Sequence, residues 1–330
     1  MTVQHRARIL GTGRYLPPRI LTNHDLERMV DTSDEWITQR TGIKERRLAE
    51  PGTATSELAC AAAKPALEAA GVGPEDIDLI IVATITPDTI LPATACWVQE
   101  QLGAAKAGAI DVVAACSGFV YGLSFAANHI EVNPEDKVLV IGAEILSYIT
   151  DYTDRASCIL FGDGAGAAVV GRSEDPERGL GTFALGADGS GAEMMITPAG
   201  GSRMPTTQET VERRLHYMQI RGREVYKFAV TKMVEMVSLA MERGDITPEQ
   251  LKLIIPHQVN IRILEAAAKR LRLPMEKIYV NIDRYGNTSA ASVPIALDEA
   301  VREGTIQPGD PVVLVAFGGG LTWAVCSMRW

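Results

Sequence analysis

The feature of this sequence that most limits its possible folds is an ordered set of apolar segments that occurs twice. Three segments of the first half recur in the second: Asp76-Ile-Asp-Leu-Ile-Ile-Val as Gln250-Leu-Lys-Leu-Ile-Ile-Pro, Ile110-Asp-Val-Val before Cys116-Ser-Gly as Ile278-Tyr-Val-Asn before Gly286-Asn-Thr-Ser, and Asp136-Lys-Val-Leu-Val-Ile-Gly as Asp310-Pro-Val-Val-Leu-Val-Ala. The same order at similar spacing over about 165 residues indicates a duplicated unit. We predict two halves, 1–175 and 176–330, that form one compact unit and join near 173–179, where Asp, Glu, Arg, Pro and Gly cluster.

Each half alternates short β-branched runs with longer Ala-rich stretches, which is typical of an α/β protein. The expected strands are Ala7–Gly11, Ile77–Ile85, Ala109–Ala114, Lys137–Gly142, Ala165–Gly171, Gly181–Gly186, Leu251–Ile255, Ile278–Ile282, Val312–Ala316 and Thr322–Met328. The expected helices are Ser56–Ala70, Ala93–Leu102, Ser117–Glu131, Gly222–Arg243, Ile261–Leu271 and Ser292–Glu303. Pro65 lies inside the first of these helices, so we expect that helix to kink there or to begin later.

Composition and charge exclude several classes of protein. Hydrophobic residues make up 46% of the chain and charged residues 22%, as in globular proteins. The net charge of −9 is opposite in sign to that of a nucleic-acid or anionic-membrane binder. The apolar runs are much shorter than the roughly 18–20 residues of a bilayer helix. The amino terminus, MTVQHRARIL, has charges where a signal peptide has its apolar stretch, so we expect a cytoplasmic protein.

The cysteines are scattered and form no CxxC pair, which argues against a disulfide framework and against a zinc site: Cys60, Cys96, Cys116, Cys158 and Cys326. Cys116 differs from the others because it lies between a predicted strand and a predicted helix. Free backbone N–H groups and the helix dipole at such a position lower the pKa of a thiol and favour the thiolate. A small buried hydrophobe is the alternative for Cys116, and it is our interpretation of the other four.

Two polar side chains are expected to lie near Cys116. His257 directly follows the apolar strand Leu251–Ile255, and ligands gather at strand ends in α/β proteins. Asn287 occupies the turn of the second half that matches the turn of Cys116, so duplication brings the two turns together. A cysteine, a neutral histidine and an asparagine amide form a nucleophile with hydrogen-bond donors, which requires no metal and no cofactor.

Two glycine-rich segments bear on nucleotide binding and ligand approach. Gly162-Asp-Gly-Ala-Gly166 lacks the spacing of a dinucleotide fingerprint and precedes a strand instead of following one. Phe317-Gly-Gly-Gly320 follows a predicted strand, so its backbone amides can approach a ligand closely, although a simple tight turn is an equal alternative. A nucleotide-binding function is therefore not indicated.

Taken together, these and further segments resemble the β-ketoacyl-acyl carrier protein synthase III family from about residue 9 to the last residue. The segments that carry the resemblance are Thr32-Ser-Asp-Glu-Trp-Ile, Arg40-Thr-Gly-Ile, Ala114-Ala-Cys-Ser-Gly-Phe, Phe161-Gly-Asp-Gly-Ala-Gly, Pro256-His-Gln, Gly286-Asn-Thr-Ser-Ala-Ala-Ser and Ala316-Phe-Gly-Gly-Gly. The resemblance implies a thiolase-like fold, with two duplicated α/β halves packed as a layered αβαβα core. It also implies an acyltransferase that condenses an acyl-coenzyme A primer with malonyl-acyl carrier protein and initiates type II fatty-acid synthesis.

The resemblance assigns roles to several residues. Cys116 would accept the acyl group, and the backbone amides of Cys116 and Gly319 would form the oxyanion hole. His257 and Asn287 would stabilise the enolate left when malonyl-carrier protein loses carbon dioxide. Coenzyme A thioester would be a substrate and not a cofactor.

Family positions that contact substrates are also present. The coenzyme A contacts would be Trp36, Arg40, Arg155 and Asn260. The docking residues for acidic acyl carrier protein would be Lys227, Arg262, Lys269 and Arg270. Leu91 stands where relatives often have Phe at the end of the acyl pocket, contributed across a homodimer interface. A smaller side chain there favours primers longer or more branched than acetyl.

Two alternative functions are open. The first is a specialised condensing enzyme that makes a quinolone, a polyketide starter or a ketone, with the same Cys116, His257 and Asn287 and a different second substrate. The second is a non-catalytic scaffold that binds acyl carrier protein. The three polar residues argue against the scaffold, because holding them in a desolvated site is costly without a chemical use.

Overall fold

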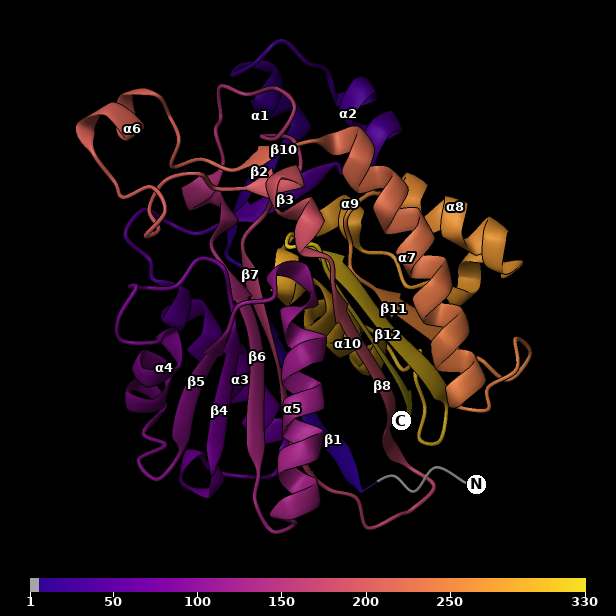
Figure 1. Cartoon of the computed structure of the whole chain (residues 1–330). Helices are drawn as coiled ribbons and strands as arrows, with labels where there is room; N and C mark the ends of the chain where they lie inside the picture. The colour runs from indigo at the N-terminus through magenta and orange to yellow at the C-terminus, as the bar shows by residue number, and fades with distance from the viewer. Residues whose placement is uncertain (1–5) are drawn as a thin grey trace.

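Two large β-sheets organise residues 6–330, the part of the chain that the computed structural model describes (Figure 1). The first sheet contains, in order, β1 (Ala7–Tyr15), β7 (Gly164–Arg172), β6 (Val138–Glu144), β4 (Leu79–Ala83) and β5 (Gly108–Val112). The second contains, in order, β8 (Gly179–Ala187), β13 (Thr322–Arg329), β12 (Pro311–Gly318) and β11 (Leu253–Pro256). The chain passes from the first sheet to the second between Arg172 and Gly179.

The two sheets repeat one another in order and direction. In the first, β4 is parallel to both β5 and β6, and β7 is antiparallel to β6 and β1. In the second, β11 is parallel to β12, and β13 is antiparallel to β12 and β8. At the position equivalent to β5, the second sheet has one parallel bridge, between Ile254 and Ile278. This repetition supports the proposed halves 1–175 and 176–330.

The predicted strand Ile278–Ile282 is wrong. Ile278 makes a single bridge, and the chain turns at Asn281 into the short helix α9 (Ile282–Tyr285). The other predicted strands are present, with ends that differ by a few residues.

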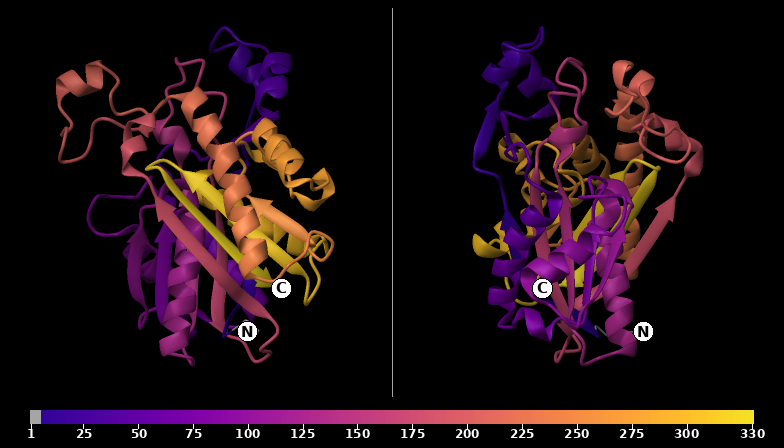
Figure 2. Two further views of the ribbon diagram at one scale, coloured as in Figure 1. Left: turned by 45° about the vertical axis from the view of Figure 1, so that its right-hand side comes forward. Right: turned by 90° about the vertical axis from the view of Figure 1, so that its left-hand side faces the viewer.

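Helices form three layers around and between the sheets (Figure 2). The central pair, α5 (Gly118–Val132) and α10 (Ser292–Arg302), packs against the inner faces of both sheets. The outer face of the first sheet is covered by α3 (Thr55–Ala70) and α4 (Thr94–Leu102). The outer face of the second sheet is covered by α7 (Gly222–Arg243) and α8 (Ile261–Leu271). The central strands are apolar on both faces because each face is buried by helices, and the layers follow the predicted αβαβα order.

Helix α3 contains Pro65 within its span and begins at Thr55, so the expectation of a later start is wrong. Its backbone lies directly on β1, where two glycines permit the approach. A Cβ at Gly11 would lie 2.4 Å from the backbone nitrogen of Ala70, and one at Gly13 would lie 2.4 Å from the carbonyl oxygen of Ala62. Only glycine allows this contact.

Short elements that the sequence pattern does not predict lie beyond the carboxyl ends of the central strands, at the top of Figure 1. They are β2 (Arg19–Thr22), α1 (Asn23–Glu27), α2 (Asp34–Thr41), β3 (Glu45–Leu48), β9 (Met195–Ile196), α6 (Gln208–Glu212) and β10 (Gln219–Ile220). These elements are too short or too polar to show a clear hydrophobic period. Within residues 6–330, no helix has the length and apolar character needed to cross a bilayer.

Candidate active site

Cys116 lies in a tight turn between β5 and α5, on the one-turn helix η2 (Ala115–Ser117). Ala115 has φ of 46°, a left-handed conformation that a residue with a Cβ adopts at a cost. A Cβ at Gly318 would lie 2.6 Å from the Cys116 nitrogen, so the end of β12 must be glycine to pack here. The turn therefore places the thiol, 5% exposed, beside the end of the second sheet.

The pKa of the Cys116 thiol is raised, contrary to the expectation that its position before α5 would lower it. Burial raises the pKa of Cys116 to about 12, and a hydrogen bond with the Ser289 side chain opposes that rise. The loss of water around the sulfur outweighs the favourable position before α5, because a thiolate is the form that desolvation disfavours. Ionisation of Cys116 therefore needs a group that accepts its proton.

His257 follows β11, and its backbone N–H donates to the Val315 carbonyl at 2.8 Å. The ring is 1% exposed and meets the ring of Phe317 edge-on, with centroids 5.8 Å apart. Burial lowers the pKa of His257 to about 3, so the imidazole is neutral at pH 7, as predicted. Neither ring nitrogen has a hydrogen-bond partner among the described residues, so the N–H of the neutral ring is available to a ligand.

Asn287 lies just before the one-turn helix η6 (Ser289–Ala291), which leads into α10. Its backbone bonds to the Phe161 segment, through the Leu160 carbonyl at 2.8 Å and the Gly162 N–H at 3.0 Å. Its side-chain oxygen accepts the N–H of Ser289 at 2.9 Å. With the oxygen occupied, the amide NH₂ is the free end, and it is a hydrogen-bond donor.

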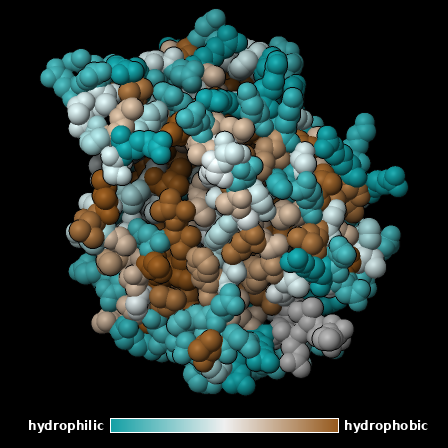
Figure 3. Space-filling view, viewed as in Figure 1, coloured by the Kyte–Doolittle hydropathy of each residue, from teal (hydrophilic) through white to brown (hydrophobic). Residues whose placement is uncertain are grey.

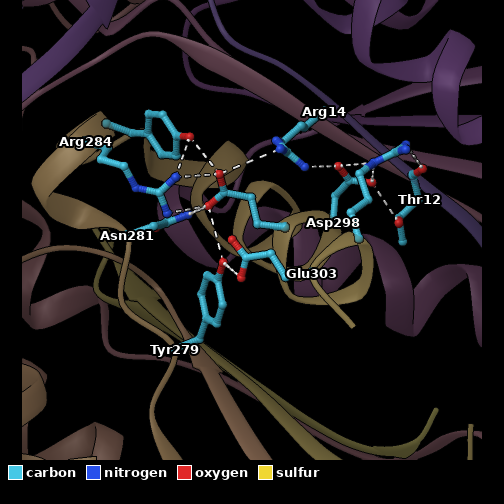
Figure 4. Close-up of polar contacts among 10 residues, drawn as sticks. Thr12, Arg14, Tyr279, Asn281, Arg284, Asp298 and Glu303 are labelled. Carbon is cyan, nitrogen blue, oxygen red and sulfur yellow. Dashed lines mark hydrogen bonds and ion pairs between the residues drawn. The ribbon is translucent and has the colours of Figure 1, made fainter. Parts of the chain in front are cut away.

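Helix α10 is held by two buried carboxylates, as Figure 4 shows. Asp298 accepts from Thr12 of β1 at 2.9 Å, which links α10 to the first sheet. The neighbouring carboxylate, Glu299, accepts from Asn281 at 2.8 Å, and the Asn281 N–H donates to Gln258, the residue after His257, at 3.1 Å. These bonds connect the turn of Asn287 with the loop of His257 through buried groups.

Cys116, His257 and Asn287 line one small cavity, together with Phe317 and Gly318. An outer cavity of about 420 Å³ is lined by Trp36, Arg40, Asn260 and Arg262, among others. The two cavities share four wall residues: Met195, Val225, Val259 and Asn287. The two cavities therefore adjoin one another.

Comparison with known proteins identifies the family. Residues 110–189 match the model of 3-oxoacyl-[acyl-carrier-protein] synthase III, and residues 241–330 match the model of its C-terminal part. The beta-ketoacyl-[acyl-carrier-protein] synthase III of Caldanaerobacter subterraneus is 59% identical over 324 residues, which is 98% of each chain. The chain belongs to the β-ketoacyl-acyl carrier protein synthase III family.

Solved structures similar to this chain have the same fold. The synthase III from Aquifex aeolicus is 48% identical, with a TM-score of 0.90 over 98% of this chain and 100% of that one. The priming β-ketosynthase from the R1128 polyketide pathway is 36% identical, with a TM-score of 0.91 over 100% of this chain and 97% of that one. The thiolase-like fold predicted from the sequence is confirmed.

In this synthase III chain, the residues predicted to contact coenzyme A gather at the outer cavity. Two guanidinium groups lie over the Trp36 ring, that of Arg40 at 4.9 Å and that of Arg155 at 4.5 Å from its centroid. The Asn260 side chain accepts the Arg262 N–H at 2.9 Å and donates to the Arg40 carbonyl at 2.9 Å. Asn260 therefore caps α8 and fixes the position of Arg40.

Other predicted residues lie outside the inner cavity. The glycine in its wall is Gly318, with Gly319 next in sequence. Leu91 is 85% exposed and does not line this cavity in its own chain. The predicted docking residues are all exposed: Lys227 on α7, and Arg262, Lys269 and Arg270 on α8. A larger cavity, of about 670 Å³, is bordered by the segment before α3 and by Tyr148 and Tyr152, and holds none of the predicted site residues.

Sequence reasoning missed two residues beside the nucleophile, Glu144 and Ser289. Glu144 ends β6 and is fully buried, and Ser289 contacts both Glu144 and Cys116. The predicted strand stopped two residues earlier, at Gly142. A single acidic residue at the end of an apolar strand was the available signal.

Proposed function

We propose that this chain condenses an acyl-coenzyme A primer with malonyl-acyl carrier protein, in two steps on one cysteine, as the first condensation of type II fatty-acid synthesis. The observation that supports this most directly is that Cys116, neutral His257 and the free amide of Asn287 line one cavity, which adjoins the outer cavity. A nucleophile and two donors are what acyl transfer followed by decarboxylation requires.

In the first step, the Cys116 thiolate attacks the thioester carbonyl of the primer. The backbone N–H groups of Cys116 and Gly319 stabilise the oxyanion, and coenzyme A leaves as a thiolate that takes up the proton lost by Cys116. The outer cavity receives the rest of coenzyme A, with Trp36, Arg40 and Arg155 at its adenine and phosphate end. Coenzyme A is part of a substrate here, and both steps use groups of the chain itself.

In the second step, malonyl-carrier protein enters the same cavity. His257 and Asn287 donate to its thioester oxygen, so the carbon–carbon bond breaks, carbon dioxide leaves and the electron pair forms an enolate. The enolate carbon attacks the acyl-Cys116 thioester, which forms the β-ketoacyl product on the carrier and releases the thiolate. Each donor acts mainly where charge develops, and one such donor is worth about 10²–10³ in rate.

The partners are an acidic acyl carrier protein and a second copy of the chain. Exposed Arg262, Lys269 and Arg270 form a basic surface on α8, beside the outer cavity that Arg262 helps to line. Such a surface attracts an acidic partner locally although the whole chain is negative.

The homodimer is supported by an apolar surface at the edge of the first sheet. β5 is the end strand of that sheet, and Figure 3 shows an apolar band on the face where β5 and α5 lie. Val113, which directly follows β5, is 77% exposed, and Leu91, in the segment between β4 and α4, is 85% exposed. A second copy that covers them removes the open edge and brings Leu91 toward the partner's acyl pocket.

Acyl transfer is tested by incubating the protein with acetyl-coenzyme A and measuring its intact mass, followed by peptide mapping. We expect one acetyl adduct, on Cys116. An unmodified protein contradicts the proposal and supports a scaffold. Addition of malonyl-carrier protein and a mixture of acyl-coenzyme A primers then gives the product. A β-ketoacyl-carrier product supports the proposed reaction, and a free ketone or quinolone supports the specialised enzyme.

A further inference from the structure

The inference concerns Glu144, a carboxyl group beside the nucleophile that the two proposed steps do not use. Glu144 is the last residue of β6 and is fully buried. One of its oxygens accepts from the Thr84 hydroxyl at 3.1 Å, the Ile85 N–H at 3.1 Å and the Thr86 hydroxyl at 2.8 Å. The other oxygen accepts from the Ser289 hydroxyl at 2.9 Å. The carboxylate has four donors and, among the described residues, no ion-pair partner.

Ser289 connects Glu144 to the nucleophile. Its hydroxyl donates to Glu144 at 2.9 Å. The turn that Ser289 begins, η6, packs against the turn of Cys116, and the Ser289 side chain opposes the rise in the pKa of the thiol. The residue is 2% exposed and has φ of 48°, so the turn holds it in a left-handed conformation that only a constrained site maintains. The three groups are all buried and lie in the order sulfur, hydroxyl, carboxylate.

The other candidate acceptor for the thiol proton is His257. Burial lowers the pKa of His257 to about 3 and raises the pKa of Glu144 to about 7. Neutral His257 is therefore a much weaker base than the carboxylate. No hydrogen bond joins either ring nitrogen to Cys116 in the described structure.

We propose that Glu144 accepts the Cys116 proton through the Ser289 hydroxyl. As the thiol proton moves to the Ser289 oxygen, the Ser289 proton moves to the carboxylate of Glu144. The sulfur gains the negative charge that the carboxylate loses, so the site contains one negative charge before and after the transfer. Two buried anions are never required, which removes the main cost of forming a thiolate there. Glu144 acts through Ser289 and is thus a positioning residue.

The pH dependence follows from the groups around the carboxylate. The loop after β4 contributes two hydroxyls and an amide, η6 contributes Ser289, and η2 contributes Cys116, which is the group among these that titrates. The buried carboxyl of Asp163, just before β7, is bonded instead to Ser147 and to the Ala49 N–H. Glu144 must be ionised to accept a proton, so the acylation rate rises with pH through about 7.

The test measures single-turnover acetylation of Cys116 from acetyl-coenzyme A between about pH 5.5 and 8.5, in wild type, Glu144→Gln, Glu144→Asp and Ser289→Ala. In Glu144→Gln we expect a rate about 10²-fold lower, without the rise near pH 7, because general-base catalysis contributes about 10²–10⁴-fold. We expect the same loss of rate and of pH dependence in Ser289→Ala, because this variant keeps the Glu144 carboxylate but lacks the hydroxyl that relays the proton. Glu144→Asp keeps a carboxylate on a shorter side chain. We expect it to be acetylated about tenfold faster than Glu144→Gln and to show again the rise in rate near pH 7.

A second measurement separates this role from a structural one. In a Cys116→Ala background, decarboxylation of malonyl-carrier protein needs no thiol proton. We expect Glu144→Gln to change it by less than about threefold. Parallel loss of both half-reactions would make Glu144 a structural residue and overturn the inference, as would Glu144→Gln acetylation with wild-type rate and pH profile. The inference rests on the proposed function; if wild type itself forms no acetyl-Cys116, that function fails, whereas an unchanged Glu144→Gln rate contradicts only the role of Glu144.

Discussion

The turn of Cys116 and the turn of Asn287 occupy equivalent places in two sheets of the same order, but they present different chemistry. Each turn is a one-turn helix, η2 or η6, that leads directly into a central helix. Each begins with a left-handed residue, Ala115 at φ of 46° and Ser289 at φ of 48°. The second residue is Cys116 in the first half and Ala290 in the second. The same backbone turn therefore carries the nucleophile in the first half, and in the second half it carries the Asn287 amide and the Ser289 hydroxyl.

The strand ends differ in the same way. Leu79 pairs with Val138 in the first sheet, and Leu253 pairs with Val312 in the second, so the registers correspond. In that register, the last residue of β6 is Glu144 and the last residue of β12 is Gly318. A buried acid thus lies beside the nucleophile, and a glycine allows the second sheet to approach it. Duplication supplies the shared geometry, and substitution at a few positions gives the two halves different side chains at equivalent places.

The largest effect is expected for Cys116→Ala, which removes the function assigned to the first turn. Acetylation by acetyl-coenzyme A should fall by at least about 10³-fold, because no second nucleophile replaces the thiol. Intact mass measures the adduct. Cys96→Ser, at an exposed cysteine, is the matched control and should acetylate normally. If Cys116→Ala still formed an acetyl adduct, the first turn would not be the one that carries the nucleophile.

The second turn is tested by Asn287→Ala and, beside it, His257→Ala. Each removes one donor to the enolate, so decarboxylation of malonyl-carrier protein should fall by about 10²–10³-fold. Acetylation of Cys116 should stay within about threefold of wild type, because neither residue is assigned to that step. Release of carbon dioxide and the intact mass report the two half-reactions separately. An equal loss in both would mean that the two turns do not divide the chemistry.

The pH profiles should separate the same two functions. Burial holds the pKa of His257 at about 3, and no charged group of the described chain is among the causes of that shift. His257 therefore stays neutral, and decarboxylation in the Cys116→Ala background should change by less than about threefold between about pH 5.5 and 8.5. A steep loss of decarboxylation below pH 6.5, as the ring gains a proton, would contradict a buried neutral donor.

The repeat, the layers and the three central residues were predictable from the sequence because they depend on long apolar runs and on strand ends. His257 directly follows such a run, and Cys116 lies shortly after another. The resting state of Cys116 was not predictable, because its pKa depends on burial by the other half of the chain. The link between Glu144 and Ser289 joins residues 145 positions apart, and no local pattern reports it. The segment at Ile278 shows the opposite error, a strand that was predicted but is not formed. Its β-branched run makes one bridge and then turns.

The smallest expected effect concerns the outer surface, where the two halves also differ. Helix α4 of the first half has no Lys or Arg, whereas its counterpart α8 has Arg262, Lys269 and Arg270. If these residues receive an acidic carrier, Arg262→Glu should raise the KM for malonyl-carrier protein about five- to tenfold, because the reversal weakens electrostatic attraction during encounter. The KM for acetyl-coenzyme A should stay unchanged.

Arg172→Glu is the matched control for this charge reversal. Arg172 is exposed at the end of β7, beside the amino-terminal end of β6 and thus opposite the end that carries Glu144. The same change in net charge at that position should leave both KM values unchanged. If Arg172→Glu raised the KM for the carrier as much as Arg262→Glu, the effect would come from overall charge. The difference between α4 and α8 would then have no part in carrier recognition.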